Sequence, residues 1–77
     1  MNISISDFMV HLDELLPPQS MSRLESEILD EPGVISANFS CCAPHLVMVT
    51  LNPDIASSSA VLHRVASKGL HARLVGL

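Results

Sequence analysis

The chain has 77 residues, 48% of them hydrophobic, and a net charge of −4 at pH 7, which predict one small globular domain over residues 1–77. The four basic residues are scattered, and the aromatic residues are two phenylalanines, with no tyrosine or tryptophan. The chain therefore lacks the clustered positive charge and the aromatic stacking surface that nucleic-acid-binding proteins use, and nucleic-acid binding is not expected. No apolar run reaches the roughly 18 residues that span a bilayer. The two cysteines are adjacent, which argues against a disulfide scaffold and favours a cytoplasmic protein with reduced thiols.

The first element is predicted over residues 7–12, where residues alternate between two sides as in a half-buried strand. One side carries Phe8, Val10 and Leu12, and the other carries Met9 and His11. A helix capped by Ser6 fits the same segment, so strand and helix both stay open for residues 7–16. The prolines Pro17 and Pro18 end the element.

A helix is predicted next, and it ends at Pro32 and Gly33. Ser22 and Glu25 have the spacing of a capping box, and either Ser20 or Ser22 is the expected N-cap. Apolar residues recur at the i, i+3, i+7 spacing of one helix face. They are Met21, Leu24 and Ile28.

Two strands follow, over residues 34–40 and 45–51, with a turn between them. In the first strand, Ile35, Ala37 and Phe39 alternate toward one side. The second strand is apolar on both sides, which predicts either a central strand or one face that meets a partner.

The last elements are a helix over residues 57–68 and a short strand over residues 71–75. The three serines at the start of the helix, Ser57, Ser58 and Ser59, offer N-caps, and Gly69 fits the position after its end. The expected buried stripe consists of Val61, Leu62, Val65 and Ala66.

This order predicts an α+β fold, a ferredoxin-like βαββαβ sandwich in which two helices cover one face of a four-stranded antiparallel sheet. The other face stays open. If Met9, Val47, Val49 or their neighbours project there, the patch is apolar enough to attract a protein partner or a second copy as a homodimer. Scattered apolar residues on a shallow surface are the alternative.

Three stretches, residues 24–34, 47–54 and 57–74, resemble the heavy-metal-associated domain family of small copper chaperones and N-terminal modules of metal-pumping P-type ATPases. The first is LESEILDEPGV, like the family's first helix and Pro-Gly-Val turn, and the second is VMVTLNPD, like its strand end. The resemblance implies the sandwich fold and a role in metal handling.

The family's metal motif, Cys-x-x-Cys between the first strand and first helix, is absent. The corresponding loop, residues 13–20, contains neither cysteine nor histidine, so no ligand of the family is carried over to this chain. Asp13 and Glu14 in this loop are expected to be solvated rather than to hold a hard cation.

The soft-ligand cluster is Cys41, Cys42 and His45, whose thiolates and imidazole suit Cu(I) or Zn(II). The alternative is that the cysteines are ordinary turn residues and His45 only begins a strand. The other histidines, His11, His63 and His71, are expected at the surface or sheet edges.

No nucleophile–base pattern or phosphate loop is present in the sequence, so an enzyme is not expected. Two hypotheses stand: a metal-handling domain with a displaced site, and a docking or oligomerisation module that binds no metal.

Overall fold

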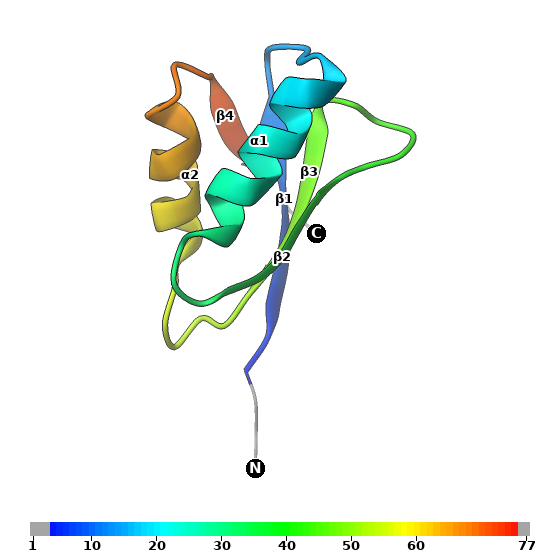
Figure 1. Ribbon diagram of the computed structural model, residues 1–77. Coiled ribbons are helices and arrows are strands. Elements are labelled where there is room, and N and C mark those ends of the chain that lie inside the picture. Colours follow the sequence, from blue (N-terminus) through cyan, green and yellow to red (C-terminus); the bar gives the residue numbers. More distant parts are fainter. Residues whose placement is uncertain (1–3, 76–77) are drawn as a thin grey trace.

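The computed structural model describes residues 4–75. Its elements are β1 (Ser6–Leu12), α1 (Pro18–Leu29), β2 (Val34–Phe39), β3 (Leu46–Leu51), α2 (Ser58–Ala66) and β4 (Ala72–Val75). The strands form one antiparallel sheet in the order β2-β3-β1-β4, and both helices lie over one of its faces (Figure 1). The predicted sandwich is confirmed, and the helical alternative for the first element is wrong.

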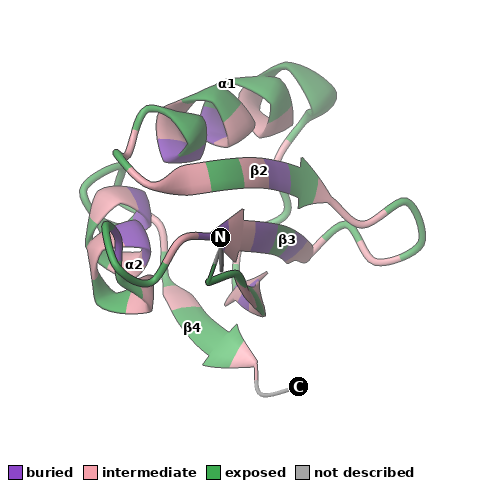
Figure 2. Cartoon of the chain, turned by 90° about the horizontal axis from the view of Figure 1, so that it is seen from below, coloured by how far each residue is buried: buried purple, intermediate pink, exposed green. Residues whose placement is uncertain are grey.

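The hydrophobic core lies between the helices and the sheet (Figure 2). Each large aliphatic side chain buried there contributes about 1.5–3 kcal/mol of transfer free energy. The buried residues are Val10, Leu12, Leu24, Ile28, Ala37, Val47, Val49, Leu51, Ala56, Val61 and Val65. Val47 and Val49 therefore face the helices, because β3 presents its odd-numbered residues to the core. Of the residues considered for the open face, these two do not lie there.

Helix α1 begins earlier than the capping pattern predicts. Pro17 is the N-cap residue and Pro18 is the first helical residue, and no side chain caps this end. Proline is suited to the first turn, where a backbone N–H has no helical partner to lose. Ser20 and Ser22 lie inside the helix, so both N-cap predictions are wrong.

Strand β2 has an irregularity that changes which residues reach the core. The pairing with β3 shifts between Val34 and Ser36, which leaves Ile35 between the two registers, as in a β-bulge. The Ile35 side chain is consequently 53% exposed, whereas Ala37 is buried. The prediction that Ile35 alternates regularly with Ala37 and Phe39 toward one side is wrong, because the register shifts at Ile35.

Helix α2 is shorter than predicted, but the prediction that a serine caps its N-terminus is confirmed. The Ser57 hydroxyl accepts a hydrogen bond from the backbone N–H of Ala60 at 3.1 Å. Val61 and Val65 are fully buried, whereas Ala66, at the end of the helix, is exposed. Ala66 was expected in the buried stripe, and that prediction is wrong because the helix stops at this residue.

The open face of the sheet combines apolar and polar residues. Directly paired residues in antiparallel strands share a face, so Met9 lies between Met48 of β3 and Val75 of β4 on the face away from the helices. His11 and Leu46 form the next pair along β1 and β3. The predicted exposure of Met9 and its neighbours on this face is therefore supported by the register.

Candidate functional site

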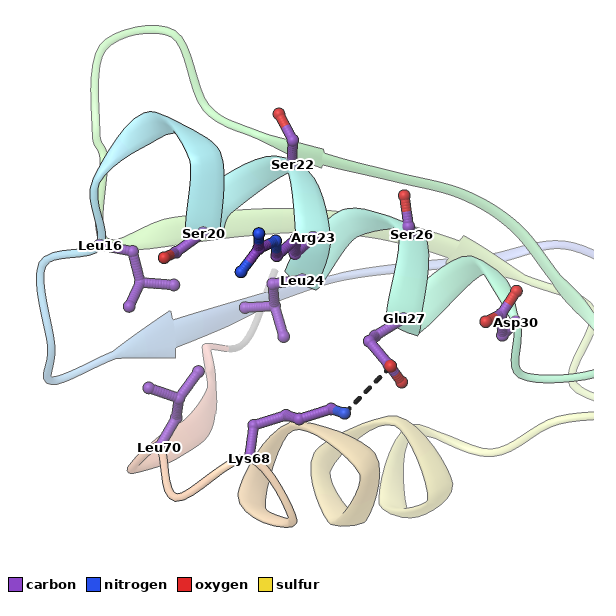
Figure 3. Close-up of a pocket in the computed structure, with 10 residues that line it drawn as sticks. All are labelled: Leu16, Ser20, Ser22, Arg23, Leu24, Ser26, Glu27, Asp30, Lys68 and Leu70. Carbon is purple, nitrogen blue, oxygen red and sulfur yellow. Dashed lines mark ion pairs between the residues drawn. The ribbon is translucent and has the colours of Figure 1, made fainter.

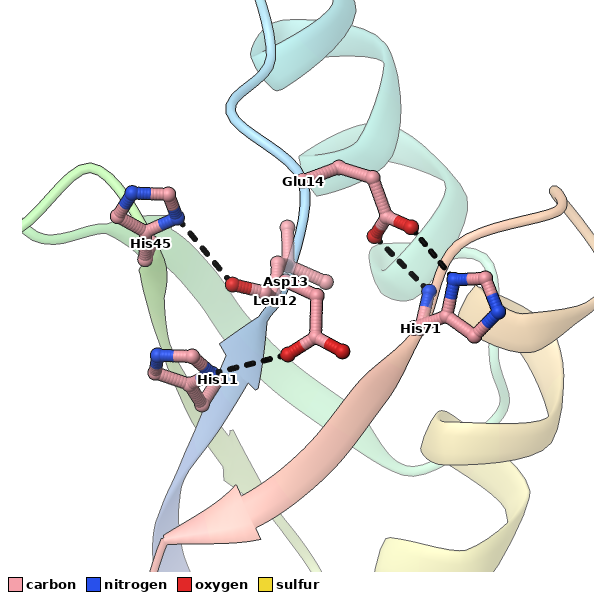
Figure 4. Close-up of polar contacts among 6 residues, drawn as sticks. All are labelled: His11, Leu12, Asp13, Glu14, His45 and His71. Carbon is pink, nitrogen blue, oxygen red and sulfur yellow. Dashed lines mark hydrogen bonds and ion pairs between the residues drawn. The ribbon is translucent and has the colours of Figure 1, made fainter.

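The loop between β1 and α1 is fixed by Glu14. One carboxylate oxygen of Glu14 lies 2.6 Å from Nδ1 of His71, and the other accepts the backbone N–H of His71 at 2.9 Å (Figure 4). The backbone N–H of Asp13 donates to the carbonyl of His71 at 2.9 Å. Three contacts thus fasten this loop to the residue that precedes β4.

The two side chains of this contact change each other's protonation. The hydrogen bond from the His71 imidazole, followed by the one from its backbone, lowers the pKa of Glu14. The same side-chain hydrogen bond raises the pKa of His71, and attraction to the Glu14 charge adds to it. The loop is therefore held most firmly when His71 is protonated and Glu14 is ionised.

A pair of stacked histidines, His11 and His45, lies on the other side of Leu12 from the Glu14–His71 contact (Figure 4). The rings of His11 and His45 stack with centroids 5.9 Å apart and planes inclined by 18°. Nδ1 of His45 lies 3.2 Å from the carbonyl oxygen of Leu12. A carbonyl only accepts, so Nδ1 carries the proton and Nε2 of neutral His45 keeps its lone pair.

Within the described part of the chain, the ring of His11 lacks the hydrogen bond that the ring of His45 makes. Its Nδ1 is shielded from solvent and makes no hydrogen bond within residues 4–75, and the nearest carboxylate oxygen, on Asp13, is 3.8 Å away. The alternation of β1 placed His11 on the open face correctly. Its position beside His45 depends on the pairing of β1 with β3, which no local pattern in the sequence reveals.

The two cysteines lie in the loop between β2 and β3, which projects from the body of the molecule (Figures 1 and 2). The loop is closed at its base by a hydrogen bond from the Ser40 N–H to the Leu46 carbonyl at 2.9 Å. Cys41 and Cys42 are both exposed and reduced, and their sulfur atoms are 3.1 Å apart. This contact raises the pKa of Cys42, because the Cys41 side chain hydrogen-bonds to it.

The structure brings together only part of the predicted metal site. Cys41 and Cys42 converge, but within the described residues no three side chains among His, Cys, Asp and Glu form a group that could hold a metal. His45 lies at the base of the loop against Leu12 and His11, so it is not grouped with the thiols here.

A groove of about 690 Å³ lies between α1 and the end of α2 (Figure 3). Leu16, Leu24 and Leu70 supply its apolar lining, and Lys68 closes one side through an ion pair with Glu27 at 3.0 Å. This ion pair lowers the pKa of Glu27. The lining contains no thiol or imidazole, so the groove offers nothing to a soft metal ion.

No helix in residues 4–75 is both long and apolar enough to cross a membrane. No protein-family model matches the sequence, and no curated protein matches it. The fold, by contrast, is similar to solved structures over nearly the whole chain.

Oxidised MerP from Ralstonia metallidurans CH34 is similar with a TM-score of 0.84 at 11% identity, covering 95% of this chain and 100% of that chain. The N-terminal domain of a potential copper-translocating P-type ATPase from Bacillus subtilis, in its Cu(I)-loaded state, gives a TM-score of 0.83 at 24% identity, covering 94% and 89%. The CopZ metallochaperone gives 0.76 at 18% identity, covering 91% and 100%. The chain therefore has the fold of the heavy-metal-associated domains that its sequence resembles.

Proposed function

We propose that this chain is a small domain that binds and hands on a soft metal ion rather than an enzyme. Its primary ligands are the thiolates of Cys41 and Cys42, and His45 is the third ligand. The observation that carries the proposal is the 3.1 Å separation of the two sulfur atoms at the tip of an exposed loop. The fold adds support, since structures with this fold include a Cu(I)-loaded domain and a metallochaperone.

Cu(I) is the metal that this set of ligands suits best. Thiolates are soft ligands that favour Cu(I), and two thiolates with one imidazole complete a three-coordinate site. Zn(II) is the second choice, because its structural sites are four-coordinate and would require one more ligand. Free thiols at the surface fit the reducing cytoplasm, where we place the protein.

His45 is prepared to act as a ligand by the hydrogen bond at its other nitrogen. Histidines that bind metals commonly donate the second ring N–H to a backbone carbonyl or carboxylate, which fixes the ring and its tautomer. Nδ1 of His45 has this contact with the Leu12 carbonyl, which leaves Nε2 for the metal. For the three ligands to meet around one metal ion, the cysteine loop has to fold toward the start of β3, and the two sulfur atoms have to move apart to about 4.0 Å.

The test is a Cu(I) titration of the reduced protein against a competing chelator. We expect one Cu(I) per chain in the wild type, loss of binding in Cys41→Ser/Cys42→Ser and weaker binding in His45→Gln. His63→Gln is the matched control, because His63 is an exposed histidine on α2. Cu(I) binding that survives the double cysteine substitution would refute the proposed site.

A second candidate function rests on the open face of the sheet. Met9, Met48 and Val75 form a continuous apolar strip across three strands, and Met48 is 42% exposed. A second copy of the chain packed on this strip would make the domain a homodimeric docking module without metal. The molecular mass from sedimentation equilibrium tests this, and Met48→Glu should convert a dimer to a monomer. A monomeric wild type at high concentration would exclude it.

A further inference from the structure

The two cysteines are adjacent, yet their side chains converge. In a regular strand, neighbouring side chains point to opposite faces and their sulfur atoms cannot meet. Here Cys41 and Cys42 lie in the bend between β2 and β3, where the Cys42 N–H approaches the Ser40 hydroxyl at 3.4 Å. This local turn, rather than the sheet, sets the sulfur separation of 3.1 Å.

This separation restricts how one atom can bridge both sulfurs. With a bond of about 2.3 Å from each sulfur to the bridging atom, sulfurs 3.1 Å apart enclose an angle of about 85°. A linear arrangement would need sulfurs about 4.6 Å apart, and a trigonal planar one about 4.0 Å. The pair as it stands therefore fits an atom that prefers bonds near 90°.

The surroundings of the thiols add a second restriction. Both cysteines are exposed, and within the described residues no third His, Cys, Asp or Glu side chain joins them as a ligand group. A bridging atom with two sulfur bonds and a third bond to its own substituent needs nothing more from the protein. Solvent around the loop tip leaves room for that substituent.

We propose that the Cys41–Cys42 pair binds a trivalent organoarsenical as a cyclic dithioarsenite. Trivalent arsenic is soft, pyramidal and bonded at angles near those of the thiol pair, and it keeps one organic substituent. The inference rests on the proposed function in that it uses the same two thiols as the metal-binding site. It adds a neutral arsenical to the soft cation as a ligand of these thiols.

The reaction balances without an oxidant or reductant. An arsenical R–As(OH)₂ and two thiols give R–As(S–Cys)₂ and two molecules of water. Two As–O bonds break, two As–S bonds form, and the thiol protons leave with the oxygens. Arsenic stays trivalent.

The experiment uses phenylarsine oxide with the reduced full-length chain, followed by native mass spectrometry and thiol counting. The wild type should gain one phenylarsenic group, lose one water relative to the reagent and lose both reactive thiols together. Cys41→Ser and Cys42→Ser each leave one sulfur, so a competing monothiol such as glutathione should remove the reagent roughly 100-fold more readily. Both substitutions lie in an exposed loop and leave the core intact.

A parallel Cu(I) titration separates this inference from the proposed function. Dithiol-dependent capture of phenylarsine oxide supports the inference, whether or not copper binds. Cu(I) binding through the cysteines without arsenical capture overturns the inference and leaves the proposed function standing. Failure of both overturns both. Capture that is as firm in either single-cysteine variant as in the wild type also overturns the inference, because a chelate needs both sulfurs.

Discussion

Glu14 holds His71 at two points, the Nδ1 atom of the ring at 2.6 Å and the backbone N–H at 2.9 Å. Glu14 belongs to the loop between β1 and α1, in which the family that the sequence resembles carries its Cys-x-x-Cys motif. In this chain the loop is instead fastened to the residue before β4. The loop contains no cysteine or histidine, and its contacts to His71 hold it in place.

The Glu14–His71 contact should make stability depend on pH. The folded-state pKa of His71 is raised above its ordinary 6.5, so its contribution is complete below about pH 6.5 and is lost as pH rises through the raised pKa. The folded-state pKa of Glu14 is lowered below 4.5, so its contribution is complete above about pH 4.5 and is lost as pH falls. Thermal unfolding of Glu14→Gln should therefore differ most from the wild type between about pH 4.5 and pH 6.5, and the difference should shrink as pH rises through the raised pKa of His71.

His63→Gln serves as the control for this experiment, because it removes an exposed histidine that lies outside the loop contact. The difference in Tm between that variant and the wild type should stay constant over the same pH range. A Glu14→Gln difference that is equally independent of pH would show that the charge of the pair contributes nothing to stability.

Gly33 should tolerate a side chain much less well than Gly69. Both have positive φ, of 95° and 81°, so alanine at either position costs about 1–2 kcal/mol in backbone conformation. A Cβ atom on Gly33 would also lie 2.8 Å from Cβ of Ala56, whereas one on Gly69 would meet nothing within 4 Å. Urea unfolding should show Gly33→Ala to be the more destabilised variant by roughly another 1–3 kcal/mol. Equal losses for the two variants would contradict this close packing.

The fold could be predicted from the sequence because apolar residues recur at the regular spacings typical of strands and helices. Alternation identified β3 as a strand with Val47, Val49 and Leu51 on one side, but both sides are apolar, so it did not show which side is buried. The i, i+3, i+7 spacing identified α1 and its buried residues Leu24 and Ile28. What it missed depends on contacts between elements. The bulge at Ile35 arises from the pairing of β2 with β3, and no residue near Ile35 signals it.

The candidate site could be predicted only in part, for the same reason. Cys41 and Cys42 are neighbours in sequence, so a turn was enough to predict that they could meet. The stacking of His11 on His45 and the contact of Glu14 with His71 join residues that are far apart in the chain. Such pairs follow from the sheet order β2-β3-β1-β4, which fixes which strand ends are adjacent.

The buried face of α1 should dominate its contribution to stability. Ile28 is fully buried, and its neighbour Leu29 is 45% exposed, so the two positions compare burial within one helix. Ile28→Ala should lower the free energy of unfolding by about 2–5 kcal/mol, through lost transfer energy and the cavity left behind. Leu29→Ala should change it by less than about 1 kcal/mol. Urea unfolding monitored by circular dichroism measures both changes. A larger loss of stability for Leu29→Ala than for Ile28→Ala would contradict the observed orientation of α1, in which Ile28 faces the core.

Glu25 provides the sharpest comparison between a sequence motif and the structure. Its spacing from Ser22 predicts a capping box, but the Glu25 carboxylate instead accepts the backbone N–H of Phe39 at 2.7 Å. A hydrogen bond to a charged acceptor contributes about 1.5–3 kcal/mol, so Glu25→Ala should destabilise the domain by an amount in this range. Ser22 is an exposed residue inside α1 with no capping role, so Ser22→Ala should be neutral or slightly stabilising. Removing an N-cap usually costs about 1 kcal/mol. A loss of this size in Ser22→Ala would support the predicted capping box and contradict the observed start of the helix at Pro18.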